Sequence, residues 1–121
     1  MSRRILVIED QEDNRWILRD LLASGGYEMI EAMTGEEGVA VAERNAPDLI
    51  LMDIQLPGID GYEATRRIKA NPALRHIPVI AVTSYSLSGD DAKAMDAGCD
   101  AYFAKPYSPR ALIAKIREYL P

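Results

Sequence analysis

The stretch DLILMDIQLPGIDG, residues 48–61, decides the fold of this chain. It begins with a continuous apolar run, LILM (49–52), and such runs are typical of strands buried on both faces in the middle of a parallel sheet. The run leads straight into Asp53, after which QLPG turns the chain. A carboxylate is costly beside a buried strand unless it has partners. Asp53 is therefore either an ordinary loop residue that caps a turn or part of a site to which other segments of the chain contribute partners.

Short apolar segments like this one recur along the rest of the chain. Three of them are continuous in aliphatic residues, as expected of central parallel strands, whereas the more polar EMIEA suits an edge strand. The predicted strands are RILVI (4–8), EMIEA (28–32), LILM (49–52), VIAV (79–82) and AYFA (101–104).

Helical patterns fill the intervals between these strands. Residues 13–24 carry apolar side chains at helical spacing, and residues 35–45 follow a capping pattern. The segment 89–97 offers mainly alanines and Met95 for burial, so we expect this helix to be the least firmly packed. Residues that favour a helix start are Thr34 with Glu37, Asp60 with Glu63, and Ser108 followed by Pro109.

Strands and helices thus alternate along the chain, which predicts a three-layer α/β domain with a parallel sheet and right-handed crossovers. The 121 residues contain no linker or repeat, so we expect one domain, 1–121, without an output domain. A net charge of −5 and the lack of Lys/Arg runs argue against nucleic-acid binding, and no segment is long and apolar enough for a membrane span. The single cysteine, Cys99, fits a reducing compartment such as the cytoplasm.

Polar side chains follow four of the five predicted strands, and ligands of parallel sheets bind outside the carboxyl ends of the strands. These residues are Glu9 with Asp10, Asp53, Thr83 with Ser84, and Lys105. Crowded carboxylates repel one another, and Mg²⁺, which prefers oxygen ligands, removes that repulsion. An aspartate can form an aspartyl-phosphate, while Lys105 neutralises charge and Thr83 donates a hydrogen bond to a phosphoryl oxygen. The pattern therefore predicts a Mg²⁺-dependent aspartyl-phosphate site.

Each of these residues also has a plain structural interpretation when it is taken alone. Glu9 and Asp10 suit a helix start, where the helix dipole favours acids. The hydroxyls at 83–84 and the amine of Lys105 suit solvated loops, and the only histidine, His76, suits a loop at the surface. Their arrangement at four successive strand ends favours the functional interpretation.

Two other classes of protein share parts of this pattern. A flavin-binding electron carrier of the same topology needs a glycine- and hydroxyl-rich phosphate loop after the first strand, whereas EDQEDN (9–14) is anionic and repels phosphate. A haloacid-dehalogenase-type phosphatase has its nucleophile near the N-terminus, with a second aspartate two residues later. Glu9-Asp10 lacks that spacing, and the sequence has no room for a cap domain.

Four segments together resemble the receiver domain of bacterial two-component response regulators: VIED (7–10), LILMDIQLPGIDG (49–61), IPVIAVTS (77–84) and AYFAKPYS (101–108). The resemblance covers essentially the whole chain, and DLILMDIQLP and HIPVIAVT are similar to the DivK-like group of that family. It implies a doubly wound, flavodoxin-like sheet of five parallel strands in the order 2-1-3-4-5, flanked by five helices.

The resemblance also implies the roles of the site residues. Asp53 would accept the phosphoryl group and Lys105 would contact it. The ligands of Mg²⁺ would be Asp53, Asp10, Glu9 acting through a water, and the backbone carbonyl of Gln55. The bond between Lys105 and the proline after it would be cis.

A switch that reports phosphorylation is implied as well. The hydroxyl of Thr83 would follow the new phosphoryl oxygens, and the ring of Tyr102 would follow the hydroxyl. Gln55, Ser84 and Tyr85 occupy positions that tune the lifetime of the phosphoryl group. A partner would read the change on the surface around the fourth helix, the fifth strand and the fifth helix.

By this resemblance the chain is a signalling protein and not an enzyme, except that it catalyses its own phosphorylation and slow dephosphorylation. The phosphoryl donor would be a histidine kinase or a histidine phosphotransferase. A downstream protein target would respond to the phosphorylated form, or the chain would pass the group on as a phosphorelay shuttle. We expect a cytoplasmic monomer or weak dimer that binds neither nucleic acid nor membrane.

Overall fold

The predicted strands pair into one parallel sheet in the order β2-β1-β3-β4-β5, within the residues that the computed structural model describes, 3–83 and 90–121. The opening stretch supplies β3, which lies in the centre of the sheet and is buried at every position. This order confirms the doubly wound, flavodoxin-like topology. The strands are β1 (Arg4–Ile8), β2 (Glu28–Ala32), β3 (Leu49–Asp53), β4 (Val79–Thr83) and β5 (Ala101–Ala104).

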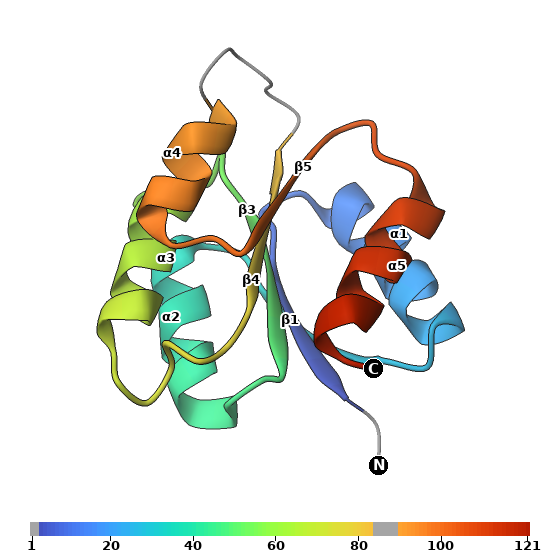
Figure 1. Cartoon of the computed structure of the whole chain (residues 1–121), viewed down its shortest axis with the longest axis horizontal. Coiled ribbons are helices and arrows are strands. Elements are labelled where there is room, and N and C mark those ends of the chain that lie inside the picture. Colours follow the sequence, from blue (N-terminus) through green and yellow to red (C-terminus); the bar gives the residue numbers. More distant parts are fainter. Residues whose placement is uncertain (1–2, 84–89) are drawn as a thin grey trace.

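Helices connect the strands and cover both faces of the sheet, so the domain has three layers (Figure 1). One face carries α2, α3 and α4, and the other carries α1 and α5 (Figure 1). No helix in the described ranges combines the length and the apolar character that a membrane crossing needs. The helices are α1 (Glu12–Ser24), α2 (Gly35–Asn45), α3 (Gly61–Ala70), α4 (Asp90–Ala97) and α5 (Pro109–Tyr119).

The predicted capping residues begin three of these helices. The side chains of Thr34, Asp60 and Ser108 each accept a hydrogen bond from the backbone N–H three residues later, at 3.0, 2.9 and 3.3 Å. Such a cap satisfies one of the free N–H groups of the first turn and so fixes where the helix begins. Asp60 in this way fixes the end of the turn that starts at Asp53.

Two hydrophobic clusters hold the layers together, one on each face of the sheet. Along β3 the side chains alternate between them: Ile50 and Met52 belong to the cluster under α2, α3 and α4, and Leu49 and Leu51 to the cluster under α1 and α5. Because β3 packs on both faces, it is a rigid support for Asp53 at its end.

Helix α4 packs through alanines, as expected, but not through Met95. The predicted burial of Met95 is wrong, since 53% of this residue is exposed, whereas Ala94 and Ala97 are buried. The contact is made by small side chains because they allow the helix to lie close to its neighbours. The first residue of the predicted helix, 89, lies outside the described residues.

Candidate functional site

The carboxyl ends of four strands carry the predicted site residues. Glu9 and Asp10 follow β1, Asp53 ends β3, Thr83 ends β4, and Lys105 follows β5. The register of the parallel strands places their carboxyl ends beside one another. The five residues therefore lie along one rim of the sheet, as the sequence predicted.

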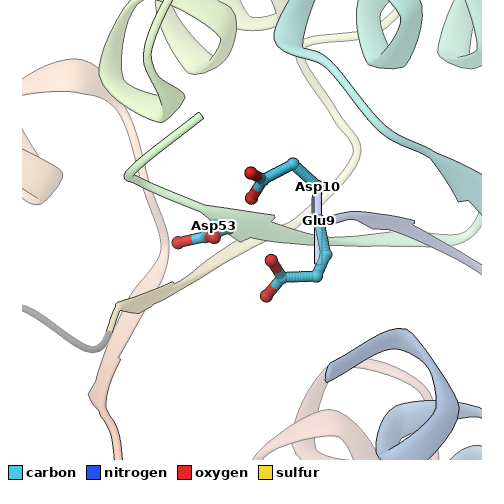
Figure 2. A group of neighbouring side chains, drawn as sticks. All are labelled: Glu9, Asp10 and Asp53. Atoms are coloured by element: carbon cyan, nitrogen blue, oxygen red, sulfur yellow. The ribbon is translucent and has the colours of Figure 1, made fainter. Parts of the chain in front are cut away.

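Three carboxylates meet at the centre of this rim. Figure 2 shows Glu9, Asp10 and Asp53 at the neighbouring ends of β1 and β3, and one carboxylate oxygen from each lies within 4.8 Å of the others. Glu9 and Asp53 are buried, with 2% and 8% of each residue exposed, whereas Asp10 is exposed. The cluster is thus open to solvent on the side of Asp10.

Glu9 is held on both of its carboxylate oxygens. The amine of Lys105 donates to Oε1 at 2.9 Å, and the backbone N–H of Gln11 donates to Oε2 at 3.1 Å. Burial by itself acts to raise the pKa of Glu9. The two hydrogen bonds, the positive charge of Lys105 and hydrogen bonding with Asp53 together outweigh burial and leave the pKa below its ordinary value. Glu9 is therefore ionised, and its charge is paired with that of Lys105.

Asp53 has the opposite electrostatic balance. Burial raises its pKa, the neighbouring Glu9 carboxylate raises it further, and the attraction of Lys105 only partly compensates, so that the pKa reaches about 7. The backbone N–H of Gln55 donates to Oδ1 of Asp53 at 3.2 Å, which is the turn-capping contact that a plain loop residue would also make. Without a cation, Asp53 is therefore partly protonated near neutral pH, where an ordinary aspartate is fully ionised.

This donor set fits a hard divalent cation. Three carboxylates offer the oxygen ligands that Mg²⁺ prefers, and a dication favours the ionised form of Asp53 that burial and Glu9 disfavour. Gln55 lies in the turn directly after the strand. Its carbonyl stays a predicted ligand.

Mg²⁺ binding is expected to depend on pH through Asp53. Because the cation displaces the proton of a group whose pKa is about 7, its apparent affinity should rise up to about tenfold per pH unit below that value and level off above it. Calorimetric Mg²⁺ titrations at about pH 5.5, 6.5, 7.5 and 8.5 measure this slope. An affinity that stays constant between the two lowest pH values would contradict the raised pKa of Asp53.

The same shift predicts how the metal-free protein responds to pH. The folded-state pKa of Asp53 lies above its ordinary value of 3.8. The protonated carboxyl therefore favours the folded state fully below about pH 4, and this contribution is lost as the pH rises through about 7. Mg²⁺ should offset the loss, so thermal midpoints with and without a chelator should diverge as the pH increases.

The two predicted switch residues lie on one face of the sheet. Tyr102 in β5 pairs with Ala81, which is two residues before Thr83 on β4. Thr83 is 1% exposed, and Tyr102 packs against the cluster under α2, α3 and α4. The hydroxyl oxygen of Tyr102 is buried and has no hydrogen-bond partner among the described residues. Ser84 and Tyr85, the other predicted tuning residues, lie outside those residues.

Some contacts of the site were not predicted from the sequence. Arg15 of α1 donates from Nη1 to the backbone carbonyl of Glu9 at 2.8 Å. Gly61 donates its N–H to the carbonyl of Ile54 at 2.9 Å and lies against the backbone of Asp53. The final glycine of LPGIDG was a visible signal for the second contact, whereas nothing local in the sequence indicates the first.

Two further expectations concern the ends of β1 and β5. Helix α1 begins at Glu12 and has Glu12 and Asp13 in its first turn, so Glu9 and Asp10 precede the helix and do not belong to its first turn. The Lys105–Pro106 peptide bond is cis, as the resemblance implied.

Comparison with known proteins supports the same family. Residues 5–117 match the sequence profile of the response regulator receiver domain. The polar-differentiation response regulator DivK of Brucella ovis is 44% identical over 120 residues, which cover 99% of this chain and 98% of that protein. The receiver domain of a sensor histidine kinase from Pseudomonas aeruginosa PAO1, solved with a magnesium ion coordinated in its active-site cleft, is 37% identical with a TM-score of 0.91, covering 99% and 98% of the two chains. A CheY-like receiver domain protein from Methanospirillum hungatei JF-1 is 33% identical, also with a TM-score of 0.91, covering 99% and 94%.

Proposed function

Because this chain belongs to the response regulator receiver domain family, we propose that it is a phosphorylation-dependent signalling switch whose phosphoryl acceptor is Asp53. The observation that carries the proposal is the position of this carboxylate. It stands at the end of the central strand, within 4.8 Å of two other carboxylates, and beside the ion pair of Glu9 with Lys105. A carboxylate at such a place is both fixed and close to groups that neutralise charge.

The residues that would hold Mg²⁺ are Glu9, Asp10, Asp53 and the backbone carbonyl of Gln55. When bound, the ion would neutralise the crowded carboxylates and the oxygens of an incoming phosphoryl group. The raised pKa of Asp53 supports this assignment, since it reflects a negative charge that the chain alone does not fully balance.

In the transfer step, a carboxylate oxygen of Asp53 forms a bond to phosphorus while the phosphorus–nitrogen bond to the donor's histidine breaks. The electron pair of the broken bond leaves on the imidazole nitrogen. A histidine kinase or a histidine phosphotransferase supplies this group. The chain itself acts by positioning and by charge: β3 fixes Asp53, and Lys105 lies at the same rim.

Lys105 exchanges partners in this proposal. Its amine lies 2.9 Å from Oε1 of Glu9. A phosphoryl group on Asp53 brings about −1.5 to −2 charges and three strong acceptor oxygens, so it competes with Glu9 for the amine. Phosphorylation thereby changes a contact that links β5 to β1.

Thr83 and Tyr102 carry the change to the surface around α4, β5 and α5, where a downstream protein binds. The hydroxyl of Thr83 donates to a phosphoryl oxygen, and Tyr102 moves with it. Two observations support this path: the two residues share one face of the sheet, and the buried hydroxyl of Tyr102 has no hydrogen-bond partner among the described residues. Such a hydroxyl destabilises its present position, so a bias of a few kcal/mol is sufficient to shift it.

The chain works in the cytoplasm as a monomer or weak dimer, and it catalyses only its own phosphorylation and slow dephosphorylation. Phosphomonoesters should therefore show no repeated turnover when they are incubated with the protein.

Phosphoryl uptake tests the proposed function directly. Incubation with a small acyl phosphate and Mg²⁺ should add one phosphoryl group per chain, as measured by intact mass, and a chelator should prevent the gain. Hydroxylamine should remove the group because it cleaves acyl phosphates. A mass gain that needs no Mg²⁺, or that resists hydroxylamine, would contradict an aspartyl-phosphate.

A further inference from the structure

The loop between β1 and α1, which carries Glu9 and Asp10, is held by an arginine of α1. The side chain of Arg15 is 12% exposed, and its Nη1 donates to the backbone carbonyl of Glu9 at 2.8 Å. Its Nε lies 3.3 Å from Oε1 of Glu31 on β2. One guanidinium group thus joins the helix, the edge strand and the peptide that precedes Asp10.

This contact restricts the direction in which Asp10 points. The carbonyl of Glu9 and the N–H of Asp10 belong to one planar peptide group. On the other side of Glu9, its own N–H donates to the carbonyl of Ala32 at 3.0 Å, so the chain is anchored on both sides of that residue. Rotation of the Glu9–Asp10 peptide would break the bond from Arg15. Since Asp10 is exposed, packing does little to orient it, and the held peptide instead fixes the position of its backbone nitrogen.

We propose that Arg15 is a positioning residue for the metal site. By holding the carbonyl of Glu9 it aims Asp10 toward Asp53 and so strengthens Mg²⁺ binding. The inference rests on the proposed function, because it requires that the carboxylate cluster binds Mg²⁺. Glu31, which also pairs with Arg19, offsets part of the charge of Arg15 and so limits the repulsion between the guanidinium group and the cation.

Arg19 provides a matched control on the same helix. Its Nη2 lies 2.6 Å from Oε2 of the same Glu31, and its side chain is 45% exposed. The contacts that the structure gives it are with Glu31 and the ring of Trp16, and neither belongs to the carboxylate cluster. Loss of either arginine removes one positive charge near the site, which on electrostatic grounds alone strengthens Mg²⁺ binding. If Arg15 positions Asp10, its loss should instead weaken Mg²⁺ binding.

Calorimetric titration with Mg²⁺ compares the wild type with Arg15→Met and Arg19→Met. Arg15→Met is expected to bind Mg²⁺ about tenfold more weakly, as is typical when a partner of a metal ligand is lost. Arg19→Met is expected to bind as tightly as the wild type or slightly more tightly. A second readout is independent of the metal: the amide nitrogen shift of Asp10 should change in metal-free Arg15→Met and stay constant in Arg19→Met.

The outcomes separate this inference from the proposed function. If the wild type binds Mg²⁺ and Arg15→Met binds it equally well or better, or if both variants weaken it alike, Arg15 has no positioning role. If the wild type itself binds no Mg²⁺, both proposals are overturned. Should Arg15→Met fail to fold, Arg15→Leu replaces it, because it likewise keeps an apolar side chain and removes the donor to the Glu9 carbonyl. Arg15→Leu should bind about tenfold more weakly, and equal affinity would reject the inference.

Discussion

Asp53→Asn is expected to abolish phosphoryl uptake completely and at the same time to stabilise the metal-free protein. The amide has nearly the shape of the carboxyl group but no carboxylate oxygen to attack phosphorus. It also removes the carboxyl group whose pKa burial and Glu9 raise to about 7. The folded state then no longer holds a buried negative charge next to Glu9. Above about pH 7 the free energy of unfolding should rise by on the order of 1–2 kcal/mol. Intact mass after treatment with an acyl phosphate, and thermal unfolding in a chelator, measure the two effects.

Asp60→Asn serves as the matched control for this variant. It makes the same chemical change a few residues later, at the cap of α3, where asparagine caps about as well as aspartate. It should take up the phosphoryl group like the wild type. Equal labelling of wild type and Asp53→Asn would show that Asp53 is not the acceptor. If Asp53→Asn were less stable than the wild type, the charge of the Asp53 carboxylate would already be balanced without a cation.

Gly61→Ala is expected to have the second large effect, on both stability and phosphoryl uptake. A Cβ at this position would clash with the carbonyl oxygen of Asp53 and would lie 2.7 Å from Cα of Ile54. These are backbone atoms beside a fully buried strand, so they have little room to move. The substitution should lower the free energy of unfolding by about 3 kcal/mol or more. It should also slow uptake in the remaining folded protein roughly a hundredfold, because a shift of about 1 Å misplaces the acceptor.

Gly26→Ala tests whether the effect belongs to that position and not to the loss of a glycine. Gly26 has φ of +85°, and an added Cβ would meet nothing within 4 Å. The cost is then only that of a left-handed alanine, about 1–2 kcal/mol, with normal phosphoryl uptake. Urea unfolding curves for the two variants compare the stabilities, and a smaller loss for Gly61→Ala than for Gly26→Ala would refute the close approach at Asp53.

The sequence by itself determined the elements of this fold and the rim on which the site lies. The continuous apolar run of β3 identified a central strand because burial on both faces excludes polar residues. The caps at Thr34, Asp60 and Ser108 were predictable because each acts on a backbone group only three residues away. Even the meeting of Asp53 with Glu9 and Asp10 followed from the sequence, since the carboxyl ends of parallel strands share one edge of the sheet.

Only the tertiary structure decided which partner each charge has. Lys105 pairs with Glu9, 96 positions away, and Arg15 joins the Glu9 carbonyl to Glu31 on another strand. The exposure of Met95 was likewise settled by the packing of α4 on its neighbours. These features depend on side-chain distances between elements that the chain brings together from remote positions. Local periodicity and propensity report which surface a residue faces, but they contain no information about which atom it meets there.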